Sequence, residues 1–145
     1  MQRASRIGLD IAKRWFRVHG VSLIDELVNA LKLGREEMLG FFAGIAPYDV
    51  ALGASGSAHC SAREIGKLGH RVKLIPPAYV KPFLQRGKND ANDARAICEA
   101  AALPNMRFVP GKRREQLTAL LLHTTRWLMI ERRTALVNSL VAQLA

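Results

Sequence analysis

The sequence is poor in cysteine, aromatic residues and acidic residues. Its two cysteines, Cys60 and Cys98, have no CxxC or Cys/His ligand spacing, which excludes a disulfide framework and a recognisable zinc motif. Aromatic residues make up 6% of the chain, which argues against a base-stacking platform of the single-strand-binding kind. No apolar run approaches the roughly 20 residues that span a bilayer, and the N-terminus lacks the apolar core of a signal peptide. We therefore expect a reduced, cytoplasmic setting and no membrane partner.

The shortage of acidic residues leaves the chain strongly basic. There are 22 Lys and Arg residues against 12 Asp and Glu residues, which gives a net charge of +10. An excess of this kind favours an anionic partner, and nucleic acid is the first candidate, although charge alone leaves open a basic protein that binds none. With 49% hydrophobic and 23% charged residues, the 145-residue chain has the composition of a globular protein with a real core.

The order of the predicted elements indicates an α/β fold. Apolar and polar residues alternate near the N-terminus, which predicts strands, and later segments show helical spacing. Three strands followed by alternating helices and strands match a ribonuclease-H-like layer arrangement with a mixed sheet and flanking helices. The predicted elements are three strands within residues 6–33, a helix within 34–45, a strand within 47–55, a helix within 57–69 ended by Gly69, a strand within 70–76, an irregular basic connector over 78–89 and a helix over 90–102.

From about Lys112 the pattern is continuously helical to the last residue. Two rows recur every seven residues and form a coiled-coil-like seam, which predicts a homo-oligomer formed through this helix. The helix is still apolar at Ala145, without a Gly cap or Pro, so we expect a chain cut short or a helix that needs a partner. The two rows are Leu120, Trp127, Thr134 and Val141, and His123, Ile130, Val137 and Leu144.

Three aspartates stand out as candidates for chemistry. Asp10 interrupts an apolar strand, where a carboxylate is costly unless it is paired or bound to a cation; the alternative is that it caps a turn at the strand end. Asp90 and Asp93 lie three residues apart on one face of a helix, although acidic residues also suit any first helical turn. A hard divalent cation needs oxygen ligands from several elements, and these three could supply them. His59 and His70 have no zinc-ligand spacing, and we expect surface or capping roles for them.

The segments "IGLDIAK", "ALGASGSAHCSAREIGKLGHRVKLIPPAYVKPFLQRGKNDANDARAICEAA", "PNMRFVPGK" and "RRTALVNSLVAQLA" together resemble the DEDD-type transposases of the insertion-sequence-110 family. The resemblance runs from about Arg6 to the end of the chain. It implies a RuvC-like domain over residues 6–110, and the start of a long helical region over 111–145. It also implies an acidic tetrad that binds Mg²⁺ or Mn²⁺, with Asp10, Asp90 and Asp93 as three of its members. The implied partners are DNA of the element and its target and a structured non-coding guide RNA.

Basic residues near the predicted acidic site are candidates for contacts with nucleic-acid phosphates, as opposed to an ordinary solvated surface. These residues are Lys13, Lys81, Arg86 and Lys88.

The chain departs from the family pattern in two places. The family has a Glu in a pattern like "EASGSAH", whereas this chain reads "GASGSAH" with Gly53 at that position, so one metal ligand is missing. Family members also continue into a C-terminal domain that carries a serine nucleophile; we expect this domain to be missing, since Ser139 does not match that serine. We therefore expect an impaired enzyme of DNA transposition and recombination. The alternative is a catalytically inactive remnant that only binds nucleic acid and self-associates.

Overall fold

The computed structural model describes residues 5–12, 14–22, 24, 26–84 and 90–144, and of Asp90 it describes the backbone only. The chain divides into two compact units, Met1–Gly111 and Lys112–Ala145.

The first unit is built on a mixed five-stranded sheet with the strand order β3-β2-β1-β4-β5. Strands β1, β2 and β3 pair antiparallel, whereas β4 pairs parallel with both β1 and β5. This is the three-strand antiparallel opening followed by alternating strands and helices that the sequence predicts, so the predicted fold class is confirmed. The strands are β1 (Arg6–Ile11), β2 (Trp15–Val21), β3 (Leu27–Gly34), β4 (Asp49–Gly53) and β5 (Arg71–Ile75).

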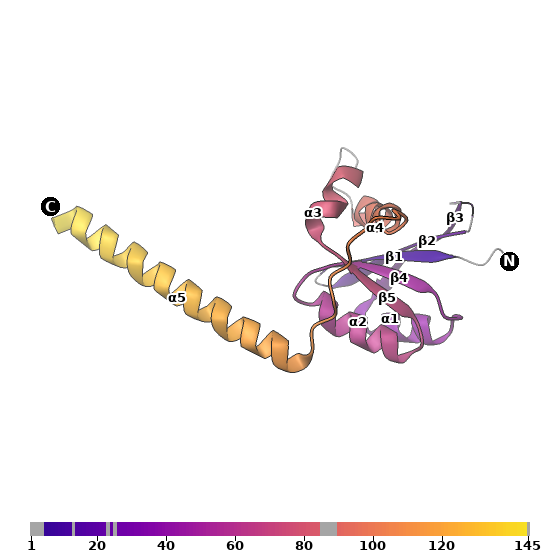
Figure 1. Cartoon of the computed structure of the whole chain (residues 1–145), viewed down its shortest axis with the longest axis horizontal. Coiled ribbons are helices and arrows are strands. Elements are labelled where there is room, and N and C mark those ends of the chain that lie inside the picture. Colours follow the sequence, from indigo (N-terminus) through magenta and orange to yellow (C-terminus); the bar gives the residue numbers. More distant parts are fainter. Residues whose placement is uncertain (1–4, 13, 23, 25, 85–89, 145) are drawn as a thin grey trace. The chain divides into compact units, whose positions relative to one another are not determined.

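Helices cover both faces of the sheet. Helices α1 (Arg35–Ala43) and α2 (Ala58–Lys67) lie on one face, and α4 (Asp90–Ala100) lies on the other (Figure 1). The core between the sheet and the α1/α2 layer contains large apolar side chains, including Leu9, Phe16, Phe42, Leu52 and Ile65. The core under α4 is smaller and rich in alanine, with Ala51, Ile75, Ala96, Ile97 and Ala100.

Two expectations from the sequence are wrong. Part of the segment expected to be an irregular connector is ordered as helix α3 (Pro77–Val80) and the 3₁₀ helix η1 (Lys81–Phe83), because Pro77 stands at the first helical position, where proline's fixed φ favours a helix. His59 and His70 are buried, not exposed. The Nδ1 atom of His70 accepts a hydrogen bond from the Tyr48 amide at 3.1 Å, and its Nε2 lies 2.8 Å from the Phe42 carbonyl oxygen. His70 therefore joins two core segments.

The end of α2 follows the prediction. Gly69 comes two residues after the last helical residue and has a φ of 94°, a left-handed conformation in which a side chain would be strained.

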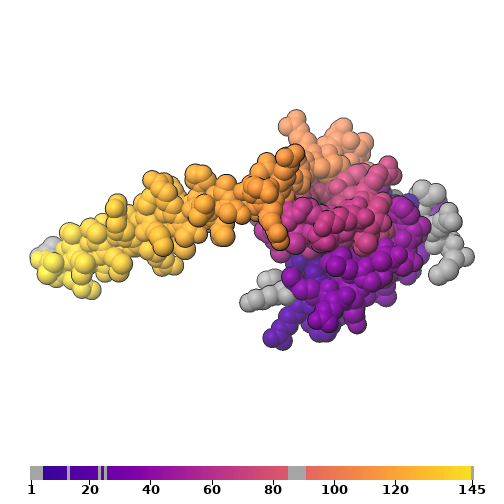
Figure 2. Space-filling view, turned by 90° about the horizontal axis from the view of Figure 1, so that it is seen from below, coloured from indigo at the N-terminus to yellow at the C-terminus, as the bar shows by residue number. Residues whose placement is uncertain are grey.

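The second unit consists of one long helix, α5 (Arg114–Leu144), of 31 residues. None of its residues is buried, and its side chains lie at the surface along the visible side of the helix (Figure 2). Its exposed apolar residues include Leu120, Trp127, Val137 and Val141, which belong to the two predicted heptad rows. Within the described part of the chain, no helix is both long enough and apolar enough to cross a membrane.

Candidate metal centre

Alternation along β1 sends its residues to opposite faces of the sheet. Ile7 and Leu9 are buried in the core on the α1/α2 side. Because neighbouring side chains of a strand point to opposite faces, Gly8 and Asp10 face α4. Asp10 is the polar residue that interrupts the apolar residues of this strand in the sequence. It does not end the strand, since it still pairs with Arg17 of β2, and it lies on the face opposite to Ile7 and Leu9.

Gly8 lets α4 approach the sheet very closely. A Cβ atom built on Gly8 would overlap the carbonyl oxygen of Ala94 and lie 2.7 Å from the Cβ of Cys98. The same Cβ atom would lie 2.8 Å from the backbone nitrogen of Cys98. The Ala94 oxygen and the Cys98 nitrogen both belong to the helix backbone and cannot rotate away. The absence of a side chain at Gly8 thus sets the depth at which α4, and with it Asp93, packs on β1.

Asp10 and Asp93 line the same pocket, which has a volume of about 310 Å³. Gly53 and Lys81 also line it. The parallel pairing of β1 with β4 matches Leu9 with Leu52, so Asp10 and Gly53 follow side by side at the carboxyl ends of the two strands. Ligands of open α/β sheets bind at this end of parallel strands. The pocket thus brings together two carboxylates from separate elements, a lysine and an open wall at Gly53.

The other predicted site residues lie outside the described part of the chain. The side chain of Asp90 and all of Lys13, Arg86 and Lys88 are among the residues that the structure does not describe. Among the described residues, no group of three His, Cys, Asp or Glu side chains is placed to hold a metal ion. Two described carboxylates with a pocket between strand and helix fit a cation that takes its remaining oxygens from water or a substrate phosphate. The assignment of Asp10, Asp90 and Asp93 as ligands stays a prediction.

Gly53 leaves space for a side chain. A Cβ atom at this position would meet only the Cδ1 of Ile97, at 3.6 Å, which is an ordinary van der Waals distance. The backbone conformation of Gly53 is not one that requires glycine. The first atom of a side chain therefore has room at the place where the family pattern has a carboxylate.

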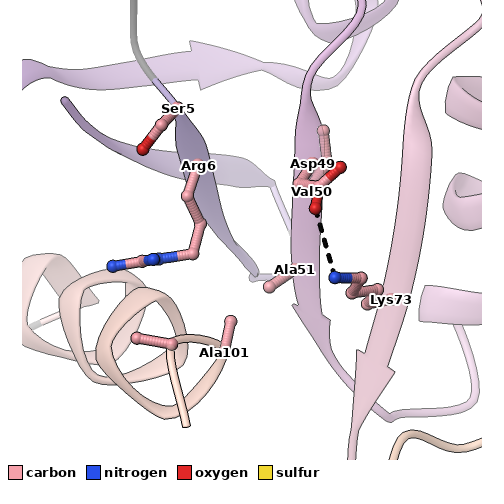
Figure 3. Close-up of a pocket in the computed structure, with 8 residues that line it drawn as sticks. Ser5, Arg6, Asp49, Val50, Ala51, Lys73 and Ala101 are labelled. Atoms are coloured by element: carbon pink, nitrogen blue, oxygen red, sulfur yellow. Dashed lines mark hydrogen bonds and ion pairs between the residues drawn. The ribbon is translucent and has the colours of Figure 1, made fainter. Parts of the chain in front are cut away.

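A second pocket lies on the same face at the amino ends of β1 and β4 (Figure 3). Arg6 points from β1 toward α4, and Asp49 and Lys73 face each other across β4 and β5 (Figure 3). Asp49 forms ion pairs with Lys73 at 3.1 Å and with Arg71 at 2.6 Å. The carboxylate at this end is thus neutralised by neighbouring strand residues.

His19 faces the underside of α4 from β2. Burial lowers the pKa of His19 from its ordinary value of 6.5, the nearby Arg95 lowers it further, and Glu99 opposes the shift. Arg6, Cys98 and Glu99 line the pocket around it. The lowered pKa of His19 is explained by its burial and by Arg95, and so does not indicate a catalytic role. His19 does not line the pocket of Asp10.

The sequence of the chain is similar to curated proteins that are named transposases. No family model matches the chain. A Pseudomonas aeruginosa protein named a family 20 transposase is 48% identical over 134 residues, which cover 92% of this chain and 40% of that protein. The Yersinia enterocolitica transposase for insertion sequence element IS1328 is 35% identical, with 98% of this chain and 42% of that protein covered. The Coxiella burnetii transposase for IS1111A is also 35% identical, with 92% of this chain and 37% of that protein covered.

Among solved structures, T. thermophilus RuvC in complex with a Holliday junction substrate matches with a TM-score of 0.49 and 14% identity, covering 72% of this chain and 98% of that one. The chain spans about two fifths of the length of the curated relatives it matches. Along nearly its whole length, the chain is a homologue of part of these curated transposases, two of which are named for insertion sequence elements.

Proposed function

We propose that this chain is the metal-binding, nuclease-type part of an insertion-sequence transposase, which acts on DNA phosphodiesters in transposition and recombination. The observation that supports this proposal is the pocket shared by Asp10 of β1 and Asp93 of α4 at the carboxyl ends of parallel strands. The names of the curated homologues favour the same reaction class.

Each residue of the pocket has a proposed role. Asp10 and Asp93, with Asp90 from the same helix as Asp93, hold a divalent cation, Mg²⁺ or Mn²⁺. When bound, the cation stabilises the charge on the attacking and leaving oxygens of a phosphodiester displacement. Lys81, which lines the pocket and is exposed, contacts a backbone phosphate and so positions the strand without reading its sequence. Lys13, Arg86 and Lys88 are proposed to add further phosphate contacts.

A second candidate function follows from Gly53. Because the wall of the pocket at Gly53 carries no ligand, the cation site has one carboxylate fewer than the family pattern. This missing carboxylate favours a second proposal, in which the chain binds nucleic acid and associates with itself but does not cleave DNA. A guide RNA remains a prediction from the resemblance alone.

The test is titration calorimetry of Mn²⁺ and Mg²⁺ on the wild type, Asp10→Asn, and the double variant Asp90→Asn/Asp93→Asn. We expect measurable binding to the wild type and a loss of at least about tenfold in affinity in both variants, because each removes charged oxygen ligands. Glu36→Gln, an exposed carboxylate in the first turn of α1, is the matched control and should bind like the wild type. Equal binding by all four proteins would contradict the assignment of the aspartates.

Self-association is proposed for α5. No residue of its two heptad rows is buried and most are exposed, and an isolated apolar helix face of this kind gains stability by burial against a partner helix. Sedimentation at increasing protein concentration should show a dimer or larger species, and Leu120→Lys/Val141→Lys should shift it to the monomer. A wild type that stays monomeric at the highest concentration would refute this proposal.

A further inference from the structure

The register of the sheet places a row of charged residues beside the Asp10 pocket. Asp10 of β1 pairs with Arg17 of β2, and Arg17 pairs in turn with Lys32 of β3. With strands about 4.8 Å apart, Arg17 lies about 5 Å and Lys32 about 10 Å from Asp10 along this row, measured between backbones. A basic row thus leads from the pocket toward the outer strand of the sheet.

This row lies on the α4 side of the sheet. Phe16 and Val18 are buried in the core on the α1/α2 side, so Arg17 between them faces the other way. The Nε atom of Arg17 is buried and makes no hydrogen bond with any other residue that the structure describes. Arg17 as a whole is only half-buried, and its charged guanidinium is not paired through Nε by any described residue, so it is a candidate for binding an anionic ligand through its other donors.

Trp15 extends the row with an aromatic ring. The Nζ atom of Lys32 lies 4.3 Å from the centroid of the Trp15 ring, within cation–π range, and this contact holds the ring against β3. Trp15 remains 46% exposed. Strand β3 is the outermost strand on this side, and its residues 29–32 are exposed, so the surface beside Trp15 is open to a ligand.

We propose that Trp15, Arg17 and Lys32 form a binding track for a single nucleic-acid strand that enters or leaves the Asp10 pocket. The direction toward the pocket rests on the proposed function; the track itself does not. Arg17 binds a phosphate through its planar guanidinium, and Lys32 binds a neighbouring phosphate as a point charge. One unpaired base stacks on Trp15, which is a single aromatic contact and not the platform of several rings that the low aromatic content argues against. The ligand is a single strand because the bases of a duplex are stacked on one another and offer no free face to Trp15.

The first experiment measures binding of fluorescein-labelled oligothymidylate by anisotropy over a range of salt concentrations, without divalent metal. The plot of log K against log salt has a negative slope. Arg17→Gln and Lys32→Gln should each make this slope less negative by about 0.7, the value for one lost phosphate contact on a single strand. Trp15→Ala should weaken binding by about five- to a hundredfold, the range for one stacked base, with little change in slope. Circular dichroism melting checks that each variant is folded.

The matched control is Lys67→Gln. Lys67 is an exposed lysine on α2, which covers the opposite face of the sheet, and the variant removes the same charge. It should leave both affinity and slope near the wild-type values. If Lys67→Gln makes the salt slope less negative by as much as Arg17→Gln and Lys32→Gln do, binding depends on overall charge and the track is refuted.

The second experiment tests stacking directly. In a Trp127→Phe background, Trp15 is the one tryptophan left in the chain, and its emission should be quenched as oligothymidylate is added. Oligouridylate should quench it similarly, since phosphates and base faces are common to RNA and DNA, whereas a blunt duplex should not. Unchanged emission on saturation with oligothymidylate would overturn the role of Trp15.

The two proposals fail in different ways. Trp15→Ala should keep the wild-type Mn²⁺ affinity, because it lies outside the metal pocket. Loss of strand binding in the track variants without any Mn²⁺ binding in the wild type would refute the metal centre and support the track. Normal Mn²⁺ binding with unaltered strand binding in all three variants would refute the track alone.

Discussion

The two faces of the sheet differ in what they bury. The face toward α1 and α2 is filled by large apolar side chains, whereas the core under α4 is smaller, mixes alanines with isoleucine and valine, and is bordered by charged residues. The first arrangement supplies hydrophobic burial, which is the main source of stability. The second brings a helix close to the sheet and leaves a pocket with charged residues in its lining near each end of that helix. Stability and the proposed chemistry are thus separated onto opposite faces of one sheet.

The largest expected effect lies on the α1/α2 face. Phe42→Ala should lower the free energy of unfolding by about 3–5 kcal/mol, because it removes a fully buried ring that contacts Phe41 and His70. If the two faces are separate, Mn²⁺ affinity measured below the melting temperature should stay near the wild-type value. A loss of metal affinity in the folded variant would show that the faces are coupled.

Gly8→Ala, on the α4 face, should lower both stability and metal affinity. The added methyl overlaps the backbone of α4, so the helix must move away from β1, at a cost of about 1–3 kcal/mol in stability. Because Asp93 moves with the helix, Mn²⁺ affinity should fall as well, which Phe42→Ala does not predict. Chemical denaturation and calorimetry together separate the two effects.

The control for this substitution adds the same methyl where there is room. Gly40 lies in α1, and a Cβ atom added there would have no obstructing atom within 4 Å. Gly40→Ala should therefore leave metal affinity unchanged and stabilise the helix slightly. Equal metal binding by Gly8→Ala and Gly40→Ala would show that Gly8 does not position Asp93 for metal binding.

Gly53→Glu should tighten Mn²⁺ binding with only a small change in stability. The Cβ atom of the new side chain has space beside Ile97, and the substitution adds a carboxylate to the wall of the pocket that Asp10 and Asp93 share. Gly56→Glu, which adds the same charge just outside the residues that line the pocket, is the control. Unchanged affinity in Gly53→Glu, measured by calorimetry, would mean that this wall is not part of a cation site.

The smallest effect concerns His19. Its pKa is lowered in the folded state by burial and by Arg95, so the unfolded state takes up the proton first as pH falls. The stability that this group contributes is present above its ordinary pKa of 6.5 and is lost as pH falls through the lowered folded value. The wild type should therefore lose more stability than His19→Gln between neutral and mildly acidic pH in urea titrations. Parallel pH profiles for the two proteins would contradict this.

Much of the fold could be predicted from local patterns. The alternation from Ile7 to Ile11 predicts a strand, and Gly69 predicts the end of a helix, because strand and helix periods and the left-handed conformation leave direct signatures in sequence. The prediction of an irregular connector after Pro76 was wrong because a short helix of four residues gives no periodic signal, and only its proline marks it. The buried histidines were missed because their burial depends on partners far along the chain, such as Phe42 for His70.

The sequence by itself determined the residue types of the candidate site and the elements that carry them. It also contained the alternation that puts Gly8 and Asp10 on one face of β1. Only the tertiary structure decided that Asp10, Gly53 and Asp93 share a pocket, and that Arg17 and Lys32 continue the same row. The physical reason is that local periodicity fixes the direction of a side chain within its own element. The distance between elements depends on strand register and on the closeness of helix packing, which Gly8 sets here through the side chain that it lacks.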